Sequence, residues 1–481
     1  MGIQVGPVGG IQGHDRQRRH SEWLVQVSVR NNVSVARPTD PIIIIGGGPG
    51  GYEAALVARQ MGAEVVLVHR EPLGGAAVLT DCVPSKALIA VANQHRRPID
   101  LVATNSRITT LAQAQSQDIQ ANLEREGIRL ISGVGRLGAP GQVEITASDG
   151  DHQVLNAKAI LIATGARPRI LDHAVPDGHR ILSWPQLWSL RHLPKRLIVV
   201  GSGVTGAEFA GAYHALGSEV VLVSSRDRVL PGEDADAAQV IEDVFQRAGV
   251  TVLGQSRATS ATATDDGVQV VLADGRVLEG SHVLMAVGST PNTEDLGLER
   301  AGVEVDERGF ITVDRVSRTT AGGVYAAGDC TGVLMLASVA AMQGRISMRH
   351  ALGGAVNPLE LDVVSSTVFT EPEIATVGVT QRDLDTGAFV GECVLLPLAS
   401  NARAKMEGIE DGFVKIFCRT QTRIIAGAVV VSPHASELIH PLTLAVQQRL
   451  TTDQLAAAFT VYPSLSGSLA EAARRLHVMD L

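Results

Sequence analysis

The feature of this sequence that most constrains its fold is a glycine turn set between apolar runs. An apolar run at 42–45 leads into Gly46-x-Gly48-x-x-Gly51, then into helix-forming residues at 52–61 and a second apolar run at 65–68. Continuous apolar runs of this length are typical of buried parallel strands. A glycine turn before a helix lets a pyrophosphate approach the backbone at the helix N-terminus. The segment therefore predicts a βαβ unit that binds a dinucleotide.

The same pattern returns 155 residues later. An apolar run at 197–200 precedes Gly201, Gly203 and Gly206, and a strand-like run at 220–223 follows the intervening helix-forming residues. Glycines at 133, 135 and 138 have the same spacing, but a turn and a strand are predicted after them rather than a helix. A single glycine turn can also be a packing feature of an ordinary α/β domain. Two complete units favour two dinucleotides held by two domains.

The residue that usually contacts the ribose lies 18 positions after the last glycine of each unit. An acid is typical there, but this chain has His69 in the first unit and Ser224 in the second. His69 can still donate a hydrogen bond to a ribose oxygen. Ser224 is followed by Ser225, Arg226 and Arg228, and guanidinium groups attract a 2′-phosphate. The second unit is therefore expected to use NADPH at least as well as NADH, unless these arginines are only solvated loop charges.

Composition excludes several classes of protein. The formal net charge is −9, which gives no general reason to bind nucleic acid or an anionic membrane. No apolar run reaches the roughly 18 residues of a membrane helix, and the first residues do not resemble a secretory signal. The four cysteines are widely spaced, which argues against a disulfide framework or a zinc site. We expect a cytoplasmic protein without a metal, in which residues 1–40 are a disordered extension.

Further motifs give the chain a family resemblance from about residue 41 to its end. They are "LGGAAVLTDCVPSK", "LIATGARPR", "VYAAGDCTG", "VGSTPNT", "STVFTEPEIATVGVT" and "FVKIFC". With the two glycine units, they make the chain similar to the flavoprotein disulfide reductases, the family of dihydrolipoamide dehydrogenase and glutathione reductase. The resemblance implies an α/β fold with two Rossmann-like dinucleotide-binding domains and an α+β C-terminal dimerisation domain. The implied divisions are an FAD-binding domain at 41–165, an NAD(P)H-binding domain at 166–288, a central segment at 289–355 that completes the FAD domain, and a dimerisation domain at 356–481.

The resemblance also implies cofactors and site residues. FAD is expected on the first unit, NADPH or NADH on the second, and a homodimer as the assembly. Lys86 is expected near the flavin N5 and paired with Glu208, and Asp329 is expected to hold the ribityl chain. The expected FAD-binding residues are Gly46, Gly48, Gly51, His69, Gly74, Gly75, Lys86, Gly135, Asp329 and Ala337. The expected nicotinamide-cofactor residues are Gly201, Gly203, Gly206, Ser224, Ser225, Arg226 and Gly288.

The chain departs from this family where the family does its disulfide chemistry. The family uses two thiols five residues apart, and a His-Pro pair near the C-terminus whose histidine acts as a base on the partner subunit, oriented by a glutamate. Here Ala77 replaces the first thiol, Tyr462 the histidine and Gly467 the glutamate, while Cys82 remains just before a predicted helix start. A lone thiol cannot form the intramolecular disulfide that stores two electrons. A tyrosine with a pKa near 10 is a poor base at pH 7.

These departures predict an enzyme that passes hydride from NAD(P)H to FAD and then to a quinone, without a redox-active disulfide. "GGAAVL", "VYPSLSGS" and "NARAKM" resemble the actinobacterial NAD(P)H quinone reductase branch of the family. The expected catalytic residues are Lys86, Glu208, Cys82 and Tyr462. The alternatives are a soluble pyridine nucleotide transhydrogenase, suggested by "SSRDR", a dihydrolipoamide dehydrogenase-like protein, and a non-enzymatic partner protein that binds FAD and a dinucleotide.

A few other residues have two interpretations. Cys330 is expected to be a packing residue rather than a redox centre, and Cys393 and Cys418 are expected to be buried in strands. Arg403 and Lys405 belong either to a surface loop or to the lining of an acceptor channel. Tyr462 is either inert packing or a lid over the flavin.

Overall fold

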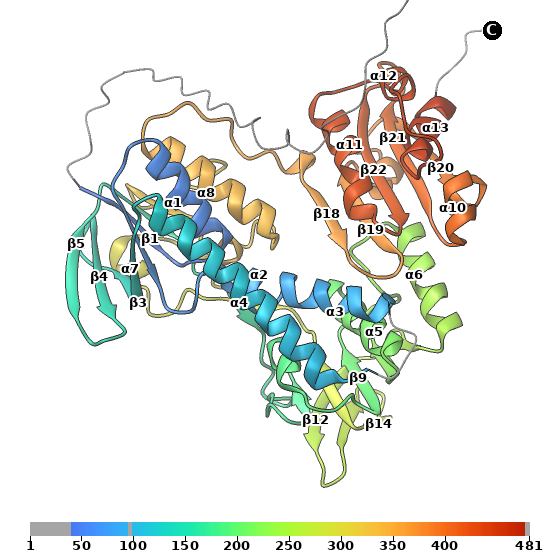
Figure 1. The fold of residues 1–481 in the computed structure, drawn as a ribbon, viewed down its shortest axis with the longest axis horizontal. Helices are drawn as coiled ribbons and strands as arrows, with labels where there is room; N and C mark the ends of the chain where they lie inside the picture. The colour runs from blue at the N-terminus through green and yellow to red at the C-terminus, as the bar shows by residue number, and fades with distance from the viewer. Residues whose placement is uncertain (1–39, 95–98, 477–481) are drawn as a thin grey trace, which may run out of the picture. The chain divides into compact units, whose positions relative to one another are not determined.

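The fold is known from a computed structural model, which describes residues 40–94 and 99–476 (Figure 1). The extension expected at 1–40 lies outside the described residues, apart from Asp40. The helices begin and end as follows: α1 (Pro49–Gln60), α2 (Gly75–Leu79), α3 (Cys82–Gln94), α4 (Leu101–Arg125), α5 (Val204–Ala215), α6 (Ala235–Ala248), α7 (Leu298–Ala301), α8 (Ala337–Ala351), α9 (Gln381–Asp385), α10 (Ala402–Glu407), α11 (Ala435–Gln447), α12 (Thr452–Ala456) and α13 (Gly467–Arg475). The 3₁₀ turns are η1 (Trp184–Ser189), η2 (Asp329–Thr331), η3 (Leu361–Val363) and η4 (Leu398–Ser400).

The first glycine unit forms the centre of a mixed sheet. In spatial order its strands are β17 (Val324–Ala326), β6 (Ala159–Ile162), β1 (Ile42–Ile45), β2 (Val65–His69), β3 (Arg129–Leu137), β4 (Gln142–Ala147) and β5 (His152–Asn156). The pairs from β17 to β3 are parallel, whereas β4 and β5 add antiparallel strands. Since β1 lies between β6 and β2, its carboxyl end is a topological switch point, where α/β sheets bind ligands. Helices α1 and α8 pack against each other beside this sheet (Figure 1).

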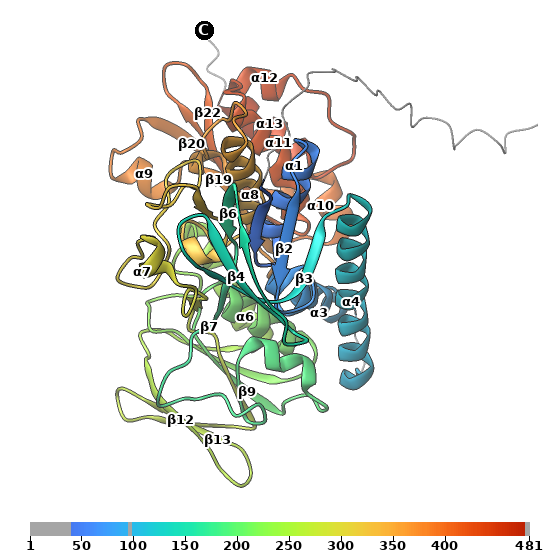
Figure 2. The same cartoon turned by 90° about the vertical axis from the view of Figure 1, so that its left-hand side faces the viewer.

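The second glycine unit builds a second parallel sheet with β9 at its centre. In spatial order its strands are β11 (Thr251–Leu253), β10 (Glu219–Val223), β9 (Arg196–Val200), β15 (His282–Met285) and β8 (Ile181–Leu182). An antiparallel sheet of β12 (Ala258–Ala263), β13 (Val268–Leu272) and β14 (Val277–Gly280) extends beside it (Figure 2). The short strands β7 (Ala166–Pro168) and β16 (Ser289–Pro291) pair antiparallel. The strands and helices predicted for both glycine units are confirmed.

The C-terminal part folds as an antiparallel sheet covered by helices. Its strands, in spatial order, are β18 (Ser365–Val368), β19 (Glu373–Gly378), β22 (Ile425–Ser432), β21 (Phe413–Arg419) and β20 (Gly391–Pro397). Cys393 and Cys418 lie in β20 and β21 as predicted, although only Cys418 is fully buried. The segment that contains Arg403 and Lys405 is the helix α10 rather than a loop, because Asn401 caps it by accepting from the backbone N–H groups of Arg403 and Ala404.

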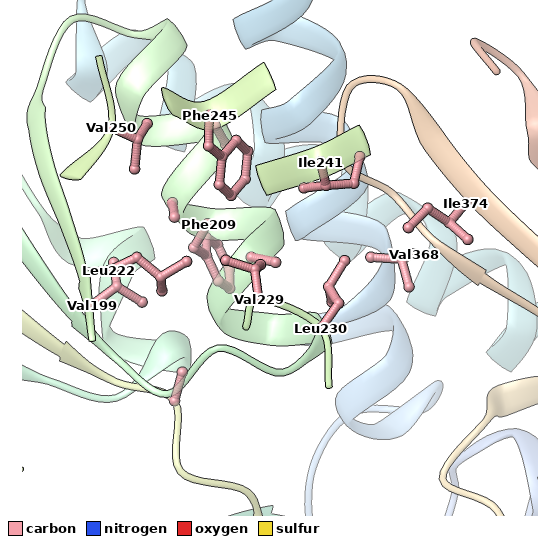
Figure 3. Packing of buried hydrophobic residues seen from close by; sticks show 14 of the residues in the cluster. Val199, Phe209, Leu222, Val229, Leu230, Ile241, Phe245, Val250, Val368 and Ile374 are labelled. Atoms are coloured by element: carbon pink, nitrogen blue, oxygen red, sulfur yellow. The ribbon is translucent and has the colours of Figure 1, made fainter. Parts of the chain in front are cut away.

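One apolar core joins these parts around α3. It includes Leu88 of α3, Phe209 of α5, Ile241 of α6 and residues of the C-terminal sheet. Figure 3 shows Val368 of β18 beside this group. By length and composition, the stretch Gly75–Gln94 is the one candidate membrane span among the described residues. In the structure it is broken into α2 and α3, and α3 packs against α4 and α5, which is the arrangement of a core helix.

Candidate active site

The first glycine turn is shaped by close backbone contacts. Gly46 has φ +117°, and a Cβ there would lie 2.1 Å from the carbonyl oxygen of Ala163. A Cβ at Gly51 would lie 1.9 Å from the carbonyl oxygen of Gly46, so only glycine lets α1 pack this close to β1. A Cβ at Gly48 would meet nothing nearer than the Cα of Gly75, at 3.9 Å. The middle glycine therefore faces open space at the N-terminus of α1, where a phosphate group can sit.

The second glycine turn has the same geometry. Gly201 has φ +111°, and its Cβ would lie 2.2 Å from the carbonyl oxygen of Ala286. A Cβ at Gly206 would lie 1.8 Å from the carbonyl oxygen of Gly201, whereas one at Gly203 would meet nothing within 4 Å. Both units thus combine two glycines that the backbone requires with one that leaves room for a ligand. The third glycine pattern, at 133–138, falls within and just after β3 and starts no helix, as predicted.

A cavity of about 880 Å³ opens at the carboxyl end of β1, next to the first turn. This volume is at the upper end of the usual range for cofactor pockets. Its lining includes these residues predicted for FAD or catalysis: Gly46, Gly48, His69, Gly75, Cys82, Gly135, Asp329 and Ala337. Its lining does not include Lys86, Gly51 or Gly74. Gly51 is turned toward β1, and Gly74 is turned toward Val78. His69 also contacts the carbonyl oxygen of Glu71 through Nδ1, at 2.9 Å.

Asp329 faces this cavity without a hydrogen-bond partner for its carboxyl group among residues 40–94 and 99–476. Burial raises the pKa of this carboxyl to about 6, and the neighbouring Asp81 carboxylate contributes to the rise. A half-buried, unpaired acceptor on a cavity wall suits the hydroxyl groups of a ribityl chain. Together with the open space at Gly48, it makes the cavity fit FAD.

The raised pKa of Asp329 has a consequence for stability. In the folded state the buried Asp329 carboxyl favours its protonated form over its ionised form. Its contribution to the free energy of unfolding is therefore fully present below the usual pKa near 4 and is lost as the pH rises through about 6. We expect Asp329→Asn to raise the melting temperature of the flavin-free protein by a few degrees at pH 8 and to leave it nearly unchanged at pH 4, in thermal unfolding followed by circular dichroism. An equal change at both pH values would contradict this account.

Cys82 and Ala77 both line the cavity, from α3 and α2. The cavity walls desolvate the Cys82 thiol and raise its pKa, and the Lys86 ammonium offsets this only in part. A thiol held in its protonated form is a poor nucleophile. All four cysteines are free, and Cys330 is fully buried, as expected of a packing residue. In the part of the chain that the structure describes, no group of three or more His, Cys, Asp or Glu residues could hold a metal ion.

The predicted pairing of Lys86 with Glu208 is present. Lys86 Nζ of α3 donates to Glu208 Oε2 of α5 at 2.8 Å, and the Glu208 side chain is only 3% exposed. The other carboxylate oxygen accepts from the backbone N–H of Phe369 at 2.9 Å, and the Lys86 ammonium lies 4.7 Å from the centroid of the Phe369 ring. Sequence reasoning missed Phe369, which joins the C-terminal part of the chain to this pair.

A second group that sequence reasoning missed lies in the turn between α2 and α3. Trp184 Nε1 donates to Asp81 Oδ1 at 2.7 Å, and Trp188 Nε1 donates to the carbonyl oxygen of Thr80 at 2.9 Å. Both tryptophans belong to η1. Two indole donors of η1 therefore fix Thr80 and Asp81, the two residues that precede Cys82. A carboxylate directly before the cysteine was the only sequence signal for this group.

The loop after β10 places the predicted nucleotide residues differently. Ser224 is fully buried, and its hydroxyl accepts from Ser202 Oγ at 2.7 Å and contacts the carbonyl oxygens of Arg226 and Arg228 at 3.1 Å. Its side chain is buried and shapes the loop, which does not fit the expected direct contact with the nucleotide. Ser225 and Arg226 are exposed, and the Arg226 guanidinium has no bond to another described residue. Gly288, with φ +95°, lies between β15 and β16.

Tyr462 lies on the C-terminal part of the chain and is 85% exposed. Phe459 and Val461, in the same loop, are also exposed. The described part of one chain therefore does not bury Tyr462, and both inert packing and a lid over the flavin stay predictions for this residue. Tyr462 is not among the lining residues of the cavity. Gly467 begins α13.

Comparison with known proteins places this architecture. Residues 40–344 match the model of pyridine nucleotide-disulphide oxidoreductases, and residues 364–473 match the dimerisation domain of the same family. A Mycobacterium tuberculosis protein named NAD(P)H dehydrogenase (quinone) is 53% identical, over 91% of this chain and 94% of that protein. A dihydrolipoyl dehydrogenase of Chlamydia pneumoniae is 33% identical, over 90% of this chain and 95% of that protein.

A solved structure agrees with this. The crystal structure of LpdA from Mycobacterium tuberculosis matches with a TM-score of 0.88 and 52% identity, and the match covers 92% of this chain and all of that one. The predicted fold class is thereby confirmed. The family uses FAD and NAD(P)H, in agreement with the two glycine turns and the cavity. The chain therefore belongs to the pyridine nucleotide-disulphide oxidoreductases, a family of FAD-dependent oxidoreductases.

Proposed function

We propose that this protein is a cytoplasmic NAD(P)H:quinone oxidoreductase that works without a redox-active disulfide. The observation that carries the proposal is the cavity wall at Ala77 and Cys82, where one sulfur stands in place of two. A single, protonated thiol cannot relay an electron pair as a dithiol does. The name of the 53% identical relative supports a quinone as the acceptor.

The chain's own residues have distinct roles in this proposal. The turn at Gly48 and the carboxyl of Asp329 hold FAD, which carries an electron pair from the nicotinamide to the acceptor when bound. The turn at Gly203, with Ser225 and Arg226, holds NAD(P)H. The ion pair of Lys86 and Glu208 keeps a positive charge fixed beside Cys82. A quinone suits such a site because it can accept electrons from FAD directly, without forming a bond to sulfur.

The assembly that we propose is a homodimer. The match to the family's dimerisation domain supports it, as does the exposed apolar loop that carries Phe459, Val461 and Tyr462. Exposed large apolar side chains that cluster in one loop are typical of a surface that another protein covers. In the proposed dimer a second copy of the chain covers this loop, which leaves Tyr462 available as a lid over the partner's site.

The test of the function is steady-state turnover with NADPH and NADH against several acceptors. We expect reduction of benzoquinones and naphthoquinones, and essentially none of oxidised lipoamide or glutathione disulfide. Transfer from NADPH to an NAD⁺ analogue without quinone would favour a transhydrogenase instead. A protein that holds FAD but shows no bleaching of it by either nucleotide would be a binding protein rather than an enzyme.

The choice of nucleotide gives a separate prediction. A charge-assisted contact between Arg226 and a 2′-phosphate is worth about 1.5–3 kcal/mol. Arg226→Ala should therefore raise the KM for NADPH by roughly 10- to 100-fold and leave the KM for NADH nearly unchanged. Arg257→Ala, at another arginine of the same domain, is the control for a general loss of positive charge. Equal changes for both nucleotides would show that Arg226 is only a solvated charge.

A further inference from the structure

Asp81 occupies an unusual place on the cavity wall. It lies between Ala77 and Cys82 in the chain, and all three residues line the cavity. Asp81 directly precedes α3, where a carboxylate often caps a helix by accepting from its first N–H groups. Its carbonyl oxygen does accept from the backbone N–H of Ser85 at 2.8 Å. Its carboxylate, however, caps no N–H group of α3 among the described residues, so helix capping does not explain this side chain.

The hydrogen bonds of Asp81 orient it instead. Oδ1 accepts from Trp184 Nε1 at 2.7 Å and from Thr80 Oγ1 at 3.0 Å. Oδ2 has no hydrogen bond to any residue in 40–94 or 99–476. Trp188 holds the adjacent Thr80 through its carbonyl oxygen. One oxygen is thus held by Trp184 and Thr80, while the other has no hydrogen bond to a described residue.

The charged groups around Asp81 come from three elements. Lys86 and Cys82 belong to α3, Asp329 to η2, and Glu208 to α5. Burial raises the pKa of Asp81, and the bonds from Trp184 and Thr80 together with the Lys86 charge offset this only in part. Asp81 in turn raises the pKa of Asp329. Burial thus makes the Asp81 carboxyl hold its proton to a higher pH than an exposed aspartate does, and the same is true of Asp329.

The proposed reaction consumes one proton in addition to the one that NAD(P)H supplies. NAD(P)H + H⁺ + quinone gives NAD(P)⁺ + hydroquinone, so NAD(P)H supplies an electron pair with one proton, and the second proton comes from water. Two carboxyls with raised pKa values line the cavity, and Asp329 is the one proposed to hold FAD. Asp81 is the other, and its Oδ2 has no hydrogen bond to any described residue.

We propose that Asp81 delivers this second proton to the quinone oxygen as the electron pair arrives, an inference that rests on the proposed function. The Asp81 O–H bond breaks, the hydroquinone O–H bond forms, and the carboxylate left behind regains a proton from water in the cavity. Trp184 and Thr80 act as positioning residues, because they hold Oδ1 and leave Oδ2 without a hydrogen bond to any described residue.

The test is Asp81→Asn in the holoenzyme. Asparagine keeps an oxygen that accepts from Trp184, so the fold and the flavin content should remain those of the wild type. Bleaching of the flavin by NADPH should also be unchanged, whereas quinone turnover at pH 7 should fall by roughly 10²- to 10⁴-fold, the range of a lost general acid. Turnover in the wild type should decline at high pH, as Asp81 loses its proton, and this decline should be absent in the variant.

Infrared pH titration of the holoenzyme gives a readout independent of activity. Carboxyls with raised pKa values, Asp329 among them, should give protonated-carboxyl bands above the usual range near pH 4, and Asp81→Asn should remove the contribution of Asp81. Glu233→Gln is the matched control, since burial and Asp234 also raise the pKa of Glu233 although it does not line the cavity. This control should lose a band of its own without a change in quinone turnover.

Trp184→Phe covers the case in which Asp81→Asn does not fold. Loss of the indole donor raises the pKa of Asp81, so the high-pH decline of quinone turnover should shift upward. Wild-type turnover and pH dependence in Asp81→Asn, or an unshifted decline in Trp184→Phe, would overturn the inference while leaving the quinone reductase intact. A wild type that reduces no quinone would instead refute the proposed function, and the proton-delivery step with it.

Discussion

Gly48→Val is expected to give a folded but colourless protein. The nearest atom to a Cβ at this position is the Cα of Gly75, 3.9 Å away, so the fold has room for the first atom of a side chain. That side chain would fill the space at the N-terminus of α1 in which the FAD pyrophosphate is proposed to sit. Purified protein should therefore keep wild-type circular dichroism and lose nearly all of its flavin absorbance.

Gly51→Val is the matched control for that experiment. A Cβ there would lie 1.9 Å from the carbonyl oxygen of Gly46, so α1 must move away from β1. This variant should lose both flavin and stability, since backbone atoms cannot yield as a flexible side chain can. Full flavin content in Gly48→Val would show that the FAD site lies elsewhere.

Cys82→Ser should keep quinone turnover within a few-fold of the wild type. The proposed reaction makes no bond to sulfur, and serine retains a small polar group at the cavity wall. Oxidised lipoamide should remain unreduced by both proteins, in assays that follow NADPH oxidation. Complete loss of quinone turnover in a Cys82→Ser protein that still holds FAD would contradict this prediction.

Ala77→Cys restores the spacing of the two thiols and tests whether they suffice. We expect it to remain a poor lipoamide reductase, because Tyr462 and Gly467 still stand where the family has the histidine base and the glutamate that orients it. Mass spectrometry after alkylation would report whether the introduced thiol forms a disulfide with Cys82 in this variant. Lipoamide reduction at the level of a true disulfide reductase would show that the C-terminal substitutions do not matter.

The sequence predicted those features that depend on nearby residues. The glycine turns were predictable because Gly46, Gly51 and the strand that precedes them lie within a few positions of one another. The third glycine pattern, at 133–138, was correctly set aside because no helix-forming run follows it. The local Pro-Ser-Lys likewise indicated a helix start just after Cys82, and α3 begins at Cys82 itself.

Features that join distant segments could not be predicted. Trp184 and Asp81 are 103 positions apart, and nothing in either segment indicates the other. Phe369 reaches the pair of Lys86 and Glu208 from the C-terminal part of the chain. Ser224 was expected to face a ligand, but neighbouring carbonyl groups bind its hydroxyl inside the loop.

The exposure of Tyr462 also lay outside what the sequence could give. Its position in the motif suggested packing or a lid, and both depend on which surface covers the loop. In one chain the side chain is 85% exposed, so the choice rests with a second subunit. The domain boundaries and the roles of individual site residues stay predictions for the same reason, because they depend on bound cofactors and a partner chain.

The central claim is that electrons leave this enzyme for a quinone and not for a disulfide. Double-mixing stopped-flow absorbance tests it most directly: the enzyme is first bleached with one equivalent of NADPH and then mixed with a naphthoquinone or with oxidised lipoamide. The account predicts rapid return of the yellow absorbance with the naphthoquinone and none above the buffer control with lipoamide. Rapid return with lipoamide, or no return with any quinone, would contradict it.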